Sequence, residues 1–180
     1  MTELEKNTIL DFASSDISVE KFYEILPQYI NEDFVIDEYE KAITEKDSEI
    51  LSYLRMIPIS NIKSLEKIYQ KLLLENWHIE SEDVVSFFQY VFNENKNNIT
   101  FLLKSLENIP EYLKIDTITK QSYIKKIIYV IGAQPQPESL LALEKLAQET
   151  NDKKIKELAL HQLEKRKRLG RWEAEMNSSK

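Results

Sequence analysis

The chain has 180 residues and no cysteine, which excludes disulfide bonds, thiolate nucleophiles and cysteine-ligated zinc. Two glycines and five prolines provide few turns between strands, while Leu, Ile, Glu and Lys are abundant, so the composition favours a single all-α domain over an all-β fold. The longest apolar run, residues 127–133, is too short to cross a bilayer, and no basic leader precedes an apolar run near the N-terminus. We therefore expect a cytoplasmic protein with no membrane partner.

The formal net charge of −7 is distributed unevenly along the chain. Residues 1–50 contain fourteen Asp or Glu against four Lys, a net charge of −10, whereas residues 51–116 carry −2 and residues 117–180 carry +5. Like charges repel one another and lower the stability of a fold. An excess of this size within fifty residues therefore indicates that the negative charge serves a function. The alternative is that these charges only solvate exposed helix faces.

The N-terminal segment, residues 1–46, predicts short and irregular helices. Thr2 and Glu5 have the spacing of a capping box, which begins the first helix. Ser18 is the expected cap of a second helix, and Pro27 should stop or kink it because proline lacks an N–H and clashes with the preceding turn.

Residues 31–33 read as a loop, and a third helix is expected to begin near Val35. Its inward-facing residues would be Ile36, Tyr39 and Ile43. Asp47 then caps the next helix and opens the central segment, residues 47–131.

The later helices of the central segment are expected at about 60–68, 82–93, 98–108 and 119–131. The β-branched run at residues 127–131 would also suit a buried strand. Helix is preferred because Lys125 and Lys126 fit a polar side and no second strand is present to pair with this one. Gly132 is the expected stop of this helix.

Residues 132–168 predict two antiparallel helices, 137–149 and 152–168, and residues 169–180 form a tail. Pro137 suits a first helical position, and Asp152 suits the cap of the second helix after a short turn. The two apolar stripes contain Leu140, Leu143, Leu146 and Ala147 on one helix and Ile155, Leu158, Ala159 and Leu163 on the other.

Small Ala residues within paired stripes, an Asn-Asp turn and a second helix with a basic end resemble one HEAT or armadillo-type repeat. Leu51, Leu54, Ile57 and Pro58 also recur, 52 residues later, as Leu103, Leu106, Ile109 and Pro110. We therefore expect an α-solenoid-like stack of about eight to ten antiparallel helices. A helix bundle, which shares the same packing rules, is the alternative.

The sequence contains no pattern that predicts catalysis, a cofactor or a metal. His78 and His161 have no histidine partner at metal-ligand spacing, and each is expected to be exposed or to cap a helix. Glu82 and Asp83 are adjacent, so they point to different sides of a helix and suit a solvated cap better than an acid–base pair. Two isolated glycines cannot form a phosphate-binding loop.

The basic run at residues 165–168, with Arg171 and Trp172, is the only candidate for nucleic-acid binding. The acidic balance of the whole chain argues against that partner. The aromatic residues Phe87, Phe88 and Phe92 are expected in the core.

A small, acidic, all-helical chain without cysteine is similar to the immunity proteins that bacteria pair with toxins, some of which are HEAT-like. That resemblance implies a protein without catalytic activity that binds a toxin's catalytic domain through a basic surface of the toxin. The expected contact residues are Glu32, Asp33, Asp37, Glu38 and Glu40, with a second surface around Trp77 and Glu82. The alternative is a helical-repeat scaffold or adaptor that binds a peptide or a partner helix.

Overall fold

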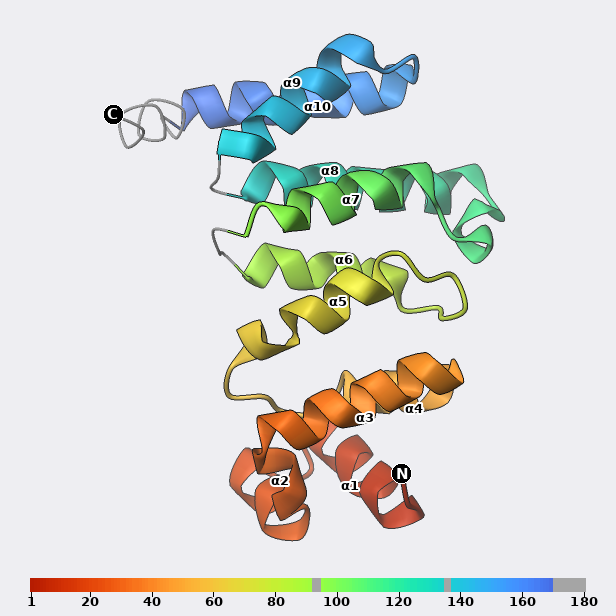
Figure 1. The fold of residues 1–180 in the computed structure, drawn as a ribbon, viewed down its shortest axis with the longest axis vertical. Coiled ribbons are helices and arrows are strands. Elements are labelled where there is room, and N and C mark those ends of the chain that lie inside the picture. Colours follow the sequence, from red (N-terminus) through yellow and green to blue (C-terminus); the bar gives the residue numbers. More distant parts are fainter. Residues whose placement is uncertain (92–94, 135–136, 170–180) are drawn as a thin grey trace. The chain divides into compact units, whose positions relative to one another are not determined.

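The structure is a computed structural model that describes residues 1–91, 95–134 and 137–169, and within these ranges it is all-helical, with ten α-helices and no strand (Figure 1). The all-α prediction is confirmed. The chain divides into two compact units, Met1–Glu80 and Ser81–Lys180, and this division falls inside the segment 47–131 that the sequence grouped together.

The first unit contains five α-helices and two 3₁₀ turns. They are α1 (Glu3–Ala13), α2 (Val19–Ile25), η1 (Pro27–Ile30), α3 (Glu32–Glu45), α4 (Ser48–Leu54), η2 (Ile62–Leu65) and α5 (Glu66–Leu72). Helix α3 packs against α4 and α5, and α1 packs against α2 and α4. The predicted caps at Thr2, Ser18 and Asp47 all accept backbone hydrogen bonds from the first turns of their helices.

The second unit is built around α8. Its elements are α6 (Ser81–Tyr90), α7 (Asn97–Glu107), η3 (Glu111–Lys114), α8 (Thr117–Ala133), α9 (Pro137–Glu149) and α10 (Lys153–Arg168). Helix α8 packs against α6, α7, α9 and α10. Its residues Ile127, Ile128, Val130 and Ile131 are fully buried, so the run that could have been a strand is the central helix of this unit.

Several predicted helix limits were inaccurate, and the largest differences concern the helix that precedes Trp77. The helix expected at 60–68 is instead a 3₁₀ turn at Ile62–Leu65 that continues as α5 to Leu72. By contrast, α9 has the predicted limits, and Asp152 caps α10 by accepting hydrogen bonds from the next backbone amides. Phe92 and the tail from residue 170 onward, including Arg171 and Trp172, lie outside the described residues.

Gly132 does not end α8, as the sequence had suggested, because the helix continues to Ala133. A Cβ at Gly132 would lie 2.4 Å from Oε1 of Gln162, a buried residue of α10. The missing side chain therefore lets α8 and α10 approach closely, which is a packing role and not a helix-stop role.

Arg166 belongs to the basic run of α10, yet only 2% of its surface is exposed. Its Nε donates to the Gly132 carbonyl at 3.2 Å, and its Nη2 donates to the Gln134 carbonyl. Gln134 in turn donates from Nε2 to the Phe88 carbonyl at 2.6 Å, and Ser139 Oγ donates to the Gln134 carbonyl at 2.9 Å. These hydrogen bonds join the C-terminal end of α8 to α6, α9 and α10. They also place the Arg166 guanidinium at the negative end of the α8 helix dipole.

Candidate functional site: the acidic surface of α3

Helix α3 carries all five acidic residues predicted as contacts. The sequence had placed a loop at residues 31–33 and a helix start near Val35, and both expectations were wrong. The Asn31 side chain accepts hydrogen bonds from the amides of Asp33 and Phe34 at 2.9 and 3.4 Å, so α3 begins at Glu32. Asparagine is a strong N-cap, and that property outweighed the polar character that suggested a loop.

Glu32 and Asp33 therefore occupy the first turn of α3. Carboxylates stabilise this position because the helix dipole is positive there. For these two residues a local structural role accounts for the charge without any partner.

The remaining acids point away from the core of the first unit. Val35, Tyr39 and Ala42 form the buried stripe of α3, whereas the predicted Ile36 and Ile43 are only half-buried. On the opposite side Asp37 is exposed, and it forms no ion pair within the described ranges. The buried stripe thus keeps the predicted Tyr39, while Val35 and Ala42 take the places of Ile36 and Ile43.

Glu40 forms an ion pair with Lys71 of α5, so it already has a partner inside the unit. About half of each side chain is exposed, 42% for Glu40 and 51% for Lys71. Exposed pairs contribute about 0–1 kcal/mol, so this contact links α3 to α5 weakly and could be exchanged for an external one.

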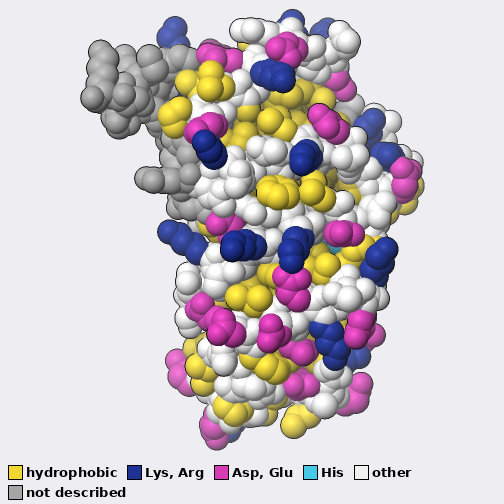
Figure 2. Space-filling view, in the orientation of Figure 1, with side chains coloured by type: hydrophobic (Ala, Val, Ile, Leu, Met, Phe, Trp, Pro, Cys, Tyr) yellow, Lys and Arg dark blue, Asp and Glu magenta, His cyan; other side chains and the backbone are white. Residues whose placement is uncertain are grey.

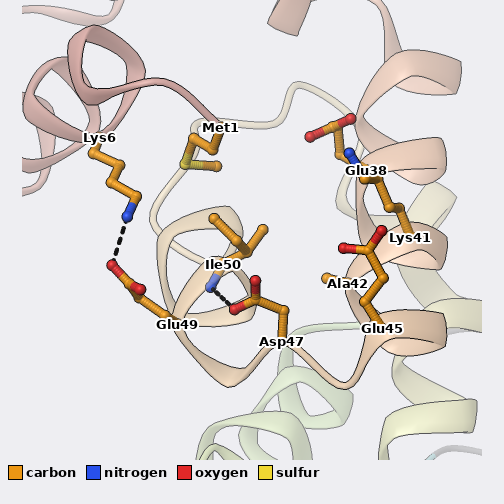
Figure 3. A pocket seen from close by; sticks show the side chains of 9 residues that line it. All are labelled: Met1, Lys6, Glu38, Lys41, Ala42, Glu45, Asp47, Glu49 and Ile50. Atoms are coloured by element: carbon orange, nitrogen blue, oxygen red, sulfur yellow. Dashed lines mark hydrogen bonds and ion pairs between the residues drawn. The ribbon is translucent and has the colours of Figure 1, made fainter.

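Glu38 lies at the edge of a pocket between α1, α3 and α4, with a volume of about 270 Å³ (Figure 3). Four carboxylates line it, from Glu38, Glu45, Asp47 and Glu49, together with Met1, Lys6, Lys41, Ala42 and Ile50. Asp47 accepts from the Ile50 amide at 2.9 Å, and Glu49 pairs with Lys6 at 2.6 Å.

Glu38 and Glu45 lie two turns apart on α3, and neither forms an ion pair within the described residues. Sequence reasoning missed Glu45, although it lies seven residues after Glu38 and therefore on the same side of a helix. It also missed Glu49, whose approach to α3 depends on the turn between α3 and α4. In that turn Lys46 adopts a left-handed conformation with φ of 54°.

Hereafter the acidic surface denotes Asp37 and the pocket carboxylates of Glu38, Glu45 and Glu49. On the face drawn in Figure 2, acidic side chains are densest over the helices of the first unit. That unit contains seventeen Asp or Glu against eight Lys or Arg, a net charge of −9, whereas the second unit has fourteen against sixteen, a net of +2. The charge asymmetry of the sequence therefore coincides with the division into units.

Trp77 and Glu82, the second predicted surface, belong to different units. Trp77 is half-buried, and its ring stands edge-on to that of His78 with the ring centres 5.1 Å apart. Its buried Nε1 has no hydrogen-bond acceptor within the described ranges. Glu82 lies in the first turn of α6, and its carboxylate is 3.7 Å from Lys126 Nζ. Each side chain thus has contacts within its own unit.

His78 is fully buried, which corrects the expectation that it would be exposed or at a cap. Nε2 lies 3.0 Å from the Leu72 carbonyl, and Nδ1 accepts from the Glu80 amide at 3.1 Å. Burial lowers the pKa of the imidazole below its ordinary value, because a buried site disfavours the charged form. With both nitrogens engaged, His78 supports the loop before α6 and is not available for catalysis.

Glu80 is part of a buried polar cluster that sequence reasoning did not anticipate. Its carboxylate forms an ion pair with Arg55 and accepts from Ser52 Oγ at 2.5 Å. Glu80 lies more than twenty positions after both Ser52 and Arg55, so no local pattern predicts its contact with them.

His161, the second histidine, is exposed as expected, and its ring stacks on Tyr129. Among the described residues, no group of three or more His, Asp or Glu side chains is arranged to hold a metal ion. None of the helices in those ranges is both long and apolar enough to cross a membrane. Comparisons of the chain with protein-family models, with curated proteins and with solved structures found no match.

Proposed function

We propose that this protein is a protein-binding inhibitor without catalytic activity, and specifically an immunity protein that neutralises a cognate bacterial toxin. In this proposal, the acidic surface of the first unit docks against a basic cleft of the toxin's catalytic domain. The observation that carries it is the set of α3 carboxylates, from the exposed Asp37 and Glu45 and the half-buried Glu38, that have no ion pair within the described residues.

Electrostatics supports this choice of partner. Gathering these carboxylates on one unit costs stability through mutual repulsion, and a basic partner would remove that cost on binding. Toxins that act on nucleic acid need basic clefts, and carboxylates can occupy such a cleft in place of phosphates. Charge complementarity also accelerates association, and the effect weakens as salt rises.

A charge-reversal experiment tests the proposal. The partner to test is the protein encoded by the reading frame next to this gene, and the variant is Asp37→Lys with Glu38→Lys. Glu40 is left unchanged because it pairs with Lys71. We expect a slower association rate with a weaker salt dependence, measured by surface plasmon resonance.

The matched control is Glu3→Lys with Asp11→Lys, which changes the net charge equally at two exposed positions of α1. Association as fast in the α3 variant as in this control would contradict a role for the acidic surface. If no toxin domain binds the unmodified protein, the immunity function itself is wrong.

A second candidate function is a helical-repeat adaptor, in which the antiparallel hairpins form an α-solenoid. It is favoured by an apolar groove of about 310 Å³ between α7, α9 and α10, lined by Leu103, Leu106, Leu146 and Ile155. An adaptor would bind extended or helical peptides through such a groove. Substituting Leu106 and Leu146 by Asp should then abolish peptide binding, whereas the Asp37→Lys, Glu38→Lys variant should bind the peptide normally.

A further inference from the structure

The second unit presents a basic and aromatic surface along α8 and α10, here called the α8–α10 face. It consists of Lys125 and Tyr129 on α8 and of His161, Lys165 and Arg168 on α10. Within each helix these residues are spaced by three or four positions, so they lie on one side of it. All except the half-buried Tyr129 are exposed.

An aromatic stack occupies the centre of the face. The rings of Tyr129 and His161 are 6.1 Å apart and inclined by only 25°, so they stack. Lys125 Nζ lies 5.5 Å from the centre of the Tyr129 ring. Because His161 is exposed and one of its faces rests on Tyr129, its imidazole presents a flat surface supported from behind.

Lys165 and Arg168 continue the face along α10. With His161 and Glu164 they line a hollow of about 110 Å³, and Lys165 also borders a second hollow of about 210 Å³ beside Tyr129 and Gly132. The face therefore has concave sites on both sides of Lys165, next to the aromatic stack.

The cations of this face differ from three lysines of the unit whose charge is already paired with a carboxylate. Lys126, Lys145 and Lys153 each lie within 4.0 Å of a carboxylate. For Lys125, Lys165 and Arg168, no ion pair is recorded within the residues that the structure describes. Their positive charge remains available to an anionic ligand.

We propose that the α8–α10 face binds single-stranded nucleic acid without sequence preference. Three unpaired cations can contact successive phosphates, and the exposed His161 ring can stack with a base. An acidic protein surface would use the cations but has no need for a flat ring among them, so the aromatic stack favours nucleic acid.

The sequence argument against nucleic acid used the net charge of the whole chain. That charge belongs to the first unit, whereas the second unit has a net charge of +2. The proposal involves only the second unit, and it does not depend on the acidic surface or on the immunity function.

Fluorescence anisotropy with a labelled oligo(dT) of about 15 nucleotides tests the proposal on the full chain. Contact of three cations with phosphates predicts that the logarithm of the binding constant falls with the logarithm of salt concentration with a slope of about −2. Lys165→Ala should reduce the magnitude of this slope by about 0.7. Lys156→Ala, on α10 but outside the face, is the matched control and should leave the slope unchanged.

His161→Ala separates stacking from charge. Loss of one base stack should weaken binding by roughly 5- to 150-fold without changing the salt slope. Circular dichroism would establish that each variant retains its helices. Absence of binding at low salt would overturn the proposal. The proposal would also be overturned if His161→Ala bound the oligonucleotide with unchanged affinity and poly-glutamate competed as well as unlabelled oligonucleotide. That result would assign the face to acidic proteins.

Discussion

The ion pair between Arg55 and Glu80 should contribute substantially to the stability of the first unit. The exposed fraction is only 11% for the Glu80 side chain and 22% for that of Arg55, so both charges are largely removed from water. Glu80→Ala deletes the acceptor for both Arg55 and Ser52 and leaves the guanidinium buried without this carboxylate. Breaking a buried pair costs about 3–5 kcal/mol, and the partial exposure of Arg55 places the expected loss near 3 kcal/mol.

Urea unfolding followed by circular dichroism measures this loss, which for a chain of this size corresponds to a decrease in Tm of about 6–12 °C. Two further variants identify its cause. Glu80→Gln keeps an acceptor for Ser52 and should cost less than Glu80→Ala. Arg55→Met combined with Glu80→Leu removes both charges and should recover most of the stability, because apolar replacement of a buried pair is often neutral.

The reasoning would be refuted if Glu80→Ala changed the free energy of unfolding by less than about 0.5 kcal/mol, the usual range for a surface substitution. A double variant less stable than Glu80→Ala would also contradict it, since the cost would then come from packing and not from an uncompensated charge.

Three other predictions concern stability. Leu158 is 8% exposed between α9 and α10, and Leu158→Ala should lower the free energy of unfolding by about 2–5 kcal/mol. An unchanged urea midpoint would contradict the pairing of these helices. Gly132→Ala should stabilise by less than the gain of about 1 kcal/mol expected in an unobstructed helix, because the new Cβ must displace the end of the Gln162 side chain. In a Gln162→Ala background the full gain should appear, and urea midpoints measure the difference. Because of His78, the free energy of unfolding should decrease as pH falls. Its pKa is lowered in the folded state, so the unfolded chain binds more protons below about pH 7, and urea titrations of His78→Gln should show a weaker pH dependence over that range.

Interactions within four residues explain why several elements were predictable. The cap at Asp152 and the first position at Pro137 set the limits of the last two helices before any tertiary contact is considered. The capping box of Thr2 and Glu5 likewise forms within α1. Hydrophobic periodicity identified the buried side of α8, although it could not distinguish a helix from a strand at residues 127–131.

The candidate site was only partly predictable, because part of it depends on contacts between residues far apart in the sequence. Its acidic character is a property of composition, and Asp37 and Glu38 follow from the sequence of α3 alone. The pocket beside Glu38 depends on Lys6 and Glu49 coming together from positions 43 residues apart. Glu40 looked available to a partner until its contact with Lys71, 31 residues away, was seen.

The sequence by itself determined helical content, most caps and the charge difference between the two ends of the chain, because these properties depend on residue type and on neighbours within one or two turns. Only the tertiary structure decided which polar groups are removed from solvent. Arg166 looked like an ordinary basic helix end, and it is buried because carbonyls of α8 and Gln134 accept its hydrogen bonds. Gly132 looked like a helix stop, and it is a point of close approach because α10 packs over it. Burial of this kind depends on the partner that folding brings near, and no local pattern encodes that partner.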